Sequence, residues 1–143
     1  MSTNSMIIAK GEDGFYRGIY SHWDGYIEHN GAILQNHYND LEKVNKLISL
    51  GNISSLEEKL PDEITNDKKD DHITFTSLNS IVQEYKDDIT TEYIYIFEDN
   101  KWLVMVNNGK TLGNIVQLDI ALALSKANNR EKLIELTGST TVL

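Results

Sequence analysis

The chain has 143 residues, with 22 acidic and 13 basic side chains, a formal net charge of −9 and no cysteine. This length fits one domain covering residues 1–143, because single cores are commonly built from about 100 to 150 residues. The lack of cysteine excludes disulfides, thiolate metal sites and a cysteine nucleophile, and it is typical of a reducing cytoplasm, where we expect the protein to act. We expect no secretory signal and no membrane span, because the first residues lack a basic head and no apolar run approaches about 20 residues.

The negative charge is concentrated in one part of the sequence. Between Glu57 and Asp99 there are 13 acidic and 4 basic residues, whereas the rest of the chain has 9 of each. Such a segment repels the phosphates of DNA and RNA, so we expect no direct nucleic-acid binding. It would instead attract a basic protein surface or a cation-rich groove. The alternative is that the acidic loops only keep the protein in solution. The acidic residues that we select as candidate contacts are Asp62, Glu63, Asp67, Asp70, Asp71, Asp87 and Asp88.

The first half predicts a hairpin followed by a short helix. The runs SMIIAK (5–10) and FYRGIYS (15–21) have the composition of strands and are joined by the turn GEDG. A glycine-rich stretch follows. Asn30 then stands where it can cap a helix over residues 31–37.

A second helix is predicted next, and an acidic connection after it. Asn39 or Asp40 can cap this helix, and Gly51 can end it. Residues 57–72 contain the only proline and few apolar side chains, so we interpret them as an exposed acidic connection within the domain. The apolar face of the helix consists of Leu41, Val44, Leu47 and Ile48.

The second half begins with a strand at 73–76 and a helix at 77–86, which its first serine can cap. The segment 92–109 is the clearest hairpin in the sequence. Two runs rich in aromatic and β-branched residues are separated there by the polar pair Asp99 and Asn100.

The segment 111–138 is predicted to be helical. In its first helix, 112–127, apolar residues occupy almost the whole circumference. Such a helix is either central to the core or covered by another subunit, so a homodimer through 112–127 is one of two alternatives. A last helix is expected between Asn129 as cap and Gly138 as stop. The element order predicts an α+β fold, a small antiparallel sheet built from two hairpins with helices packed on one face.

No pattern in the sequence predicts a nucleotide or another cofactor. The NGKT run at 108–111 follows a strand, as a phosphate-binding loop does, but the glycine required five residues before Gly109 is Val104. No serine lies in a nucleophile-elbow pattern, and the paired carboxylates fall in turns, where we expect them to be solvated. We therefore expect a protein that is not an enzyme.

The stretch GIYSHWDGYIEHNGAILQNHY raises the question of a metal site, because it holds three of the four histidines. His22, Asp24 and His29 are metal-ligand types, and a metal-dependent hydrolase can be imagined from them. Their spacing argues against it. His22 and Asp24 flank a tryptophan at a strand end, and no second cluster with a recognised metal spacing supports them, so no metal ligand is nominated.

Two other interpretations of the stretch stay open. In the structural one, His22 and Asp24 hydrogen-bond the backbone of a tight loop while Trp23 and Tyr26 pack. In the other, exposed aromatic rings beside glycine and short polar groups form a binding surface. The candidate binding residues are His22, Trp23, Asp24, Tyr26 and Asn30.

Residues 18–56 also resemble the opening motif of a family of small, mostly uncharacterised proteins encoded by phages, prophages and mobile elements. The family pattern is a strand ending in Y-x-H-W-D-G-Y-P-E, then N-G and two helices. Ile27 stands where the family usually has proline, and the part after Lys110 is outside the resemblance. The shared positions are His22, Trp23, Asp24, Gly25, Tyr26, Glu28, Asn30 and Gly31.

The resemblance implies a phage-type accessory protein, and such proteins often occupy a host protein or sequester a small molecule. The leading hypothesis is therefore a non-enzymatic inhibitor of a host defence protein, similar to an anti-CRISPR protein, in which the acidic segment mimics nucleic acid. The first alternative is a small-ligand binding protein that uses the loop from His22 to Tyr26. The second alternative is the metal-dependent hydrolase.

Overall fold

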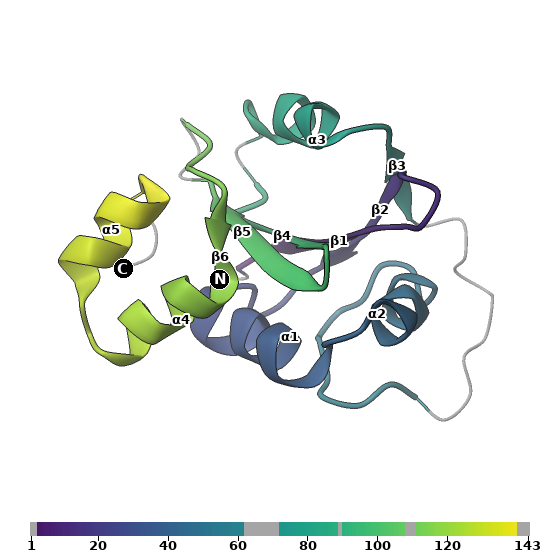
Figure 1. The fold of residues 1–143 in the computed structure, drawn as a ribbon, viewed down its shortest axis with the longest axis horizontal. Helices are drawn as coiled ribbons and strands as arrows, with labels where there is room; N and C mark the ends of the chain where they lie inside the picture. The colour runs from purple at the N-terminus through teal and green to yellow at the C-terminus, as the bar shows by residue number, and fades with distance from the viewer. Residues whose placement is uncertain (1–2, 62–71, 89, 108–110, 140–143) are drawn as a thin grey trace.

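The computed structural model describes residues 3–61, 72–88, 90–107 and 111–139, and it has an α+β fold, as the sequence predicts (Figure 1). The strands are β1 (Ser5–Lys10), β2 (Tyr16–Ser21), β3 (Ile73–Phe75), β4 (Tyr93–Glu98), β5 (Lys101–Val106) and β6 (Val116–Gln117). The helices are a π-helical turn η1 (Ile27–Gly31) and the α-helices α1 (Ala32–His37), α2 (Leu41–Ile48), α3 (Leu78–Tyr85), α4 (Leu118–Lys126) and α5 (Arg130–Thr137). None of the helices in these ranges has the length and apolar character that crossing a membrane requires.

Both predicted hairpins are present, and they join at the centre of one sheet. The strand order is β3-β2-β1-β4-β5-β6. The two hairpins meet through β1 and β4, which pair in parallel with Met6 opposite Ile94. All other neighbouring strands are antiparallel.

Helices cover both faces of the sheet. One face packs against α1, α2 and α4. The other face, which the predicted arrangement leaves without a helix, is covered by α3 (Figure 1). The reason lies in the central strands. In β1 and β4 the side chains on both faces are apolar and buried, with Ile7 and Tyr95 on one side and Ile8 and Ile94 on the other. Strands that are apolar on both faces need cover on both.

The predicted helix caps are largely confirmed. Asp40 accepts a hydrogen bond from the backbone N–H of Lys43 at 2.8 Å. The side chains of Ser77 and Asn129 cap α3 and α5 in the same way. The prediction for Asn30 is wrong, because α1 has no side-chain cap and the Asn30 amide is used inside the protein.

The predicted helix over 112–127 starts later than expected. Residues before α4 are extended: Leu112 bridges to Asn107, and β6 pairs with β5. A Cβ on Gly113 would lie 2.3 Å from the carbonyl oxygen of Thr137, so this glycine lets the two backbones approach closely. In α4 itself the apolar residues form a buried stripe on one side, whereas Ile120 is 45% exposed.

The acidic connection is only partly described. Glu57, Glu58 and Lys59 are exposed, as predicted. The candidate residues Asp62, Glu63, Asp67, Asp70 and Asp71 lie outside the described residues, and so does most of the NGKT run.

Candidate functional site

The loop between β2 and η1 is held against two neighbouring backbone segments. The N–H groups of His22 and Trp23 donate to the carbonyl oxygens of Ile53 and Ser54, at 3.1 and 2.9 Å. The N–H of Gly25 donates to the carbonyl oxygen of Thr3 at 2.8 Å. The loop path is therefore fixed by main-chain bonds on both sides.

Gly25 is required by this close approach. A Cβ at this position would lie 2.8 Å from the Thr3 carbonyl oxygen and 2.9 Å from the Ser5 Cβ. The preceding residue, Asp24, has a positive φ of 56°, which aspartate tolerates better than most side chains. The Tyr95 hydroxyl, fully buried, donates to the Gly25 carbonyl oxygen at 2.6 Å and ties the loop to β4.

Asn30 is the buried polar centre of the loop. Its side chain is 0% exposed, and the amide nitrogen lies 3.3 Å from the Ser5 Oγ, the Ser21 Oγ and the Trp23 carbonyl oxygen. Its amide oxygen lies 3.1 Å from the His29 Nδ1. This candidate binding residue thus links β1, β2 and the loop, and its polar groups are used inside the protein.

The aromatic candidates project outward. Trp23 is 45% exposed and Tyr26 is 37% exposed, so each side chain is partly covered and partly open to solvent. His22 bonds a side chain, with its Nδ1 2.9 Å from the Tyr20 hydroxyl oxygen, and its ring meets the Trp23 ring edge-on at 4.6 Å. The Tyr26 and His29 ring centres are 5.9 Å apart. A firmly anchored loop therefore presents a small group of rings to solvent.

A hollow of about 700 Å³ adjoins the loop, with Asp24 and His29 in its lining. At its rim the Nε2 of His29 is 4.0 Å from the Asp24 carboxylate. The Nε2 of His37 is 3.7 Å from the Glu58 carboxylate. The hollow is lined by Asp24, His29, Ile33, Ser55, Leu56, Glu57, Glu58 and Lys59.

The three side chains considered for a metal site are only partly brought together. His29 and Asp24 are neighbours, whereas the ring of His22 points to Tyr20 and Trp23. Within the described ranges no group of three or more histidine, aspartate or glutamate side chains is arranged to hold a metal ion.

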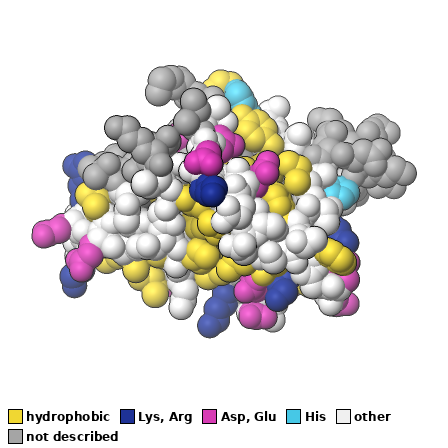
Figure 2. Space-filling model, turned by 90° about the horizontal axis from the view of Figure 1, so that it is seen from above, with side chains coloured by type: hydrophobic (Ala, Val, Ile, Leu, Met, Phe, Trp, Pro, Cys, Tyr) yellow, Lys and Arg dark blue, Asp and Glu magenta, His cyan; other side chains and the backbone are white. Residues whose placement is uncertain are grey.

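The acidic side chains that are described do not form one face. Glu57 and Glu58 line the hollow next to η1 and α1, whereas Glu84 and Asp87 belong to α3 and its end, on the opposite face of the sheet. Viewed from the α3 side, carboxylates occur in separate groups with Lys and Arg side chains beside them (Figure 2).

Asp88, another candidate contact, is engaged in a local turn. Its carboxylate accepts from the N–H and hydroxyl of Thr90, at 2.6 and 2.8 Å, and from the N–H of Thr91 at 3.1 Å. Burial opposes ionisation, but these hydrogen bonds outweigh it and hold the pKa of Asp88 below its ordinary value. This side chain therefore stabilises the connection from α3 to β4.

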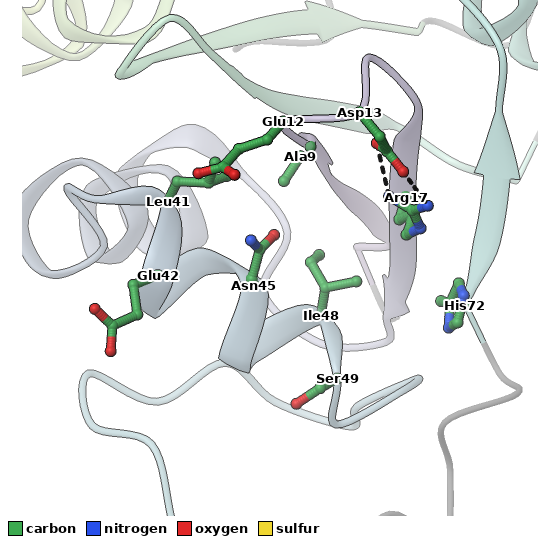
Figure 3. A pocket seen from close by; sticks show the side chains of 11 residues that line it. Ala9, Glu12, Asp13, Arg17, Leu41, Glu42, Asn45, Ile48, Ser49 and His72 are labelled. Atoms are coloured by element: carbon green, nitrogen blue, oxygen red, sulfur yellow. Dashed lines mark hydrogen bonds and ion pairs between the residues drawn. The ribbon is translucent and has the colours of Figure 1, made fainter.

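A second pocket, of about 680 Å³, lies between the β1–β2 turn and α2 (Figure 3). Ala9, Leu41 and Ile48 contribute its apolar part. On its strand side Asp13 and Arg17 are bonded to each other at 2.7 and 3.2 Å. Since this ion pair already satisfies both groups, and the described residues that line the pocket include no phenylalanine, tyrosine or tryptophan, we favour the aromatic loop as the functional site.

Comparisons of the chain with protein-family models, with curated protein sequences and with solved structures found no match. The assignment of a site therefore depends on the geometry of this chain. Sequence reasoning found the loop but missed the part of the hollow formed by residues 55–59. The acidic pair Glu57 and Glu58 is visible in the sequence, but no sequence pattern indicates that this pair lies next to the loop in the folded chain.

We expect Asn30→Ala to lower the free energy of unfolding by about 1–3 kcal/mol, because it leaves buried hydroxyl and carbonyl groups without their amide partner. Urea unfolding measures the loss. Asn36→Ala, at an exposed position in α1, should change stability by less than about 0.5 kcal/mol. Equal stability of the Asn30→Ala protein and the wild type would contradict the role given to this amide.

Asp88→Asn should destabilise the protein at neutral pH, because the charged carboxylate is the better acceptor for the Thr90 and Thr91 groups. The pKa of Asp88 is lowered in the folded state, so its contribution is present above the ordinary value of 3.8 and is lost as pH falls through the folded-state pKa. The wild type and variant should therefore converge in urea unfolding at acidic pH. Asp87→Asn, at the exposed neighbouring position, is the control and should change the free energy of unfolding at neutral pH by less than about 0.5 kcal/mol.

Proposed function

We propose that this chain is a non-enzymatic binding protein and that its contact surface is the loop from His22 to Tyr26. The observation that carries the proposal is the combination of a rigid backbone with exposed rings. Main-chain bonds and the buried Asn30 amide hold the loop, while Trp23 and Tyr26 stay partly exposed to solvent. Large aromatic side chains bury much area on binding and lose few rotatable bonds, and a pre-ordered loop lowers the entropic cost further.

Structural needs explain only some of the shared motif positions. Gly25, Asn30 and Gly31 lie where close packing or buried hydrogen bonds require them. Trp23 and Tyr26 are 45% and 37% exposed, and their ring contacts are with His22 and His29. Contact with a partner is the role that fits the second set. The resemblance to phage-type proteins extends the proposal to a host protein as that partner, in the host cytoplasm.

The test is a double variant, Trp23→Ala with Tyr26→Ala. A partner recovered from host lysate on the immobilised wild-type protein, and then purified, should bind the double variant at least about tenfold more weakly by calorimetry, because central aromatic contacts carry most of the energy of an interface. Urea unfolding should be almost unchanged, since both rings are exposed.

Phe15→Ala is the matched control, because Phe15 is 43% exposed in the β1–β2 turn, away from the loop. It should bind the partner as the wild type does. Full binding by the double variant, or equal loss in the Phe15→Ala protein, would remove the loop from the contact surface.

A second candidate is docking of the acidic segment on a basic groove, as in mimicry of nucleic acid against an RNA-guided nuclease. The segregation of the whole charge excess between Glu57 and Asp99 favours it. The described carboxylates of this segment lie on both sides of the sheet. The mimicry therefore depends on the acidic residues between 62 and 71.

Reversing Asp62, Glu63, Asp70 and Asp71 to lysine should abolish inhibition of a purified RNA-guided nuclease complex, because the added positive charge repels the groove. DNA cleavage in the presence of each variant is the measurement. A control that reverses Glu12, Glu42, Glu131 and Glu135 should still inhibit. If the wild type does not inhibit, or if both reversed proteins inhibit equally, the mimicry is refuted.

A further inference from the structure

We propose that the protein forms a homodimer in which the outer face of α4 packs against the same face of a second copy, with the two helices antiparallel. The dimer goes beyond the proposed binding function and does not depend on it. The outer face of α4 consists of Asp119, Ile120, Ala123, Leu124, Lys126 and the adjoining Ala127.

The outer face of α4 is apolar where a surface helix is normally polar. The helix lies at the outside of the fold, beside α1 and α5, and its inner side is buried (Figure 1). On the opposite side, Ile120, Ala123, Leu124 and Ala127 follow one another at the i, i+3, i+4 and i+7 spacing of one helix face. Ile120 is 45% exposed, Ala123 and Ala127 are exposed, and Leu124 is half-buried. Single exposed apolar residues are common, whereas several that adjoin on one helix face indicate a contact surface.

The charges at the two ends of this face fit a second copy of the chain. Asp119 and Lys126 are both exposed and are seven residues apart, so they lie on the same side of the helix, about two turns from each other. Neither forms an ion pair with another side chain among the residues that the structure describes. A two-fold axis near Ala123 would place Asp119 of each copy beside Lys126 of the other. The face is therefore complementary to itself in the antiparallel arrangement.

The side chains between the two charges allow close packing in the same arrangement. Antiparallel pairing about Ala123 brings Ile120 of one copy against Leu124 of the other. The small side chains of Ala123 and Ala127 let the helices approach to the lower end of the usual range of about 8–10 Å between axes. A helix of nine residues gives a contact only about 14 Å long, so we expect a weak dimer whose amount depends on the protein concentration.

Sedimentation velocity at increasing protein concentration, up to about 1 mM, tests for this dimer. The average mass should rise from the 16.3 kDa of one chain towards twice that value. Ile120→Glu should lower the association constant at least about tenfold, because it places a charge in the apolar contact. Urea unfolding of this variant should resemble that of the wild type, since Ile120 is exposed.

Charge reversals test the antiparallel arrangement. Asp119→Lys alone and Lys126→Asp alone should each weaken self-association about tenfold, because like charges then face each other across the axis. A mixture of these two variants should associate again, since one chain is basic and the other is acidic at both positions. Native mass spectrometry identifies the heterodimer by its mass. The chain that carries both reversals should dimerise as the wild type does.

The double reversal also separates dimerisation from the effect of the helix dipole. Asp119 and Lys126 have the signs that stabilise the two ends of a helix, so the double reversal should lower stability in urea unfolding while the dimer returns. Glu84→Lys in α3, on the opposite face of the sheet, is the control and should dimerise as the wild type does.

Three results would overturn the proposed dimer. The first is a wild-type mass that stays at 16.3 kDa over the whole concentration range. The second is dimerisation of the Ile120→Glu protein with the affinity of the wild type. The third is a mixture of the two single charge reversals that associates no more strongly than either variant alone.

Discussion

The buried amide of Asn30 is the interaction on which the candidate surface depends. It lies between the hydroxyl groups of Ser5 in β1 and Ser21 in β2, and it is also within hydrogen-bonding distance of the Trp23 carbonyl oxygen. A buried amide is stable only when its polar groups are paired, so this arrangement specifies one position of the loop. The position of the Trp23 backbone, and with it the position of its exposed ring, is therefore fixed by the buried Asn30 amide.

The same logic explains why the loop is rich in glycine. Gly25 lies against the backbone before β1, and Gly31 lies against Leu118 and Tyr95, where an added Cβ would come within 3.4 Å of other side chains. Both glycines bring the loop and η1 close enough to the sheet for the Tyr95 hydroxyl to reach the Gly25 carbonyl oxygen. The segment 22–31 therefore both packs against the sheet and carries the exposed aromatic side chains.

Local patterns predicted most of the fold, and contacts distant in sequence account for what they missed. The caps at Asp40, Ser77 and Asn129 and the turn at Asp99 and Asn100 depend on neighbouring residues, and the structure has all of them. The late start of α4 depends on Gly113 meeting Thr137, and the hollow depends on residues 55–59 returning to the loop. Periodicity carries no information about such encounters. Asn30 has the residue type of a helix cap, but its side chain bonds the buried hydroxyl groups of Ser5 and Ser21, and residue type alone does not distinguish these two roles.

The parallel pairing of β1 with β4 has a consequence for synthesis of the chain. The first hairpin can form early, but the free edge of β1, with Met6 and Ile8 among its residues, meets its partner only when Ile94 and Ile96 have left the ribosome. Contacts between such distant segments slow folding, and an unpaired apolar edge invites association with other chains in the meantime. A nascent chain stalled before β4 would therefore be a candidate for chaperone binding or for aggregation.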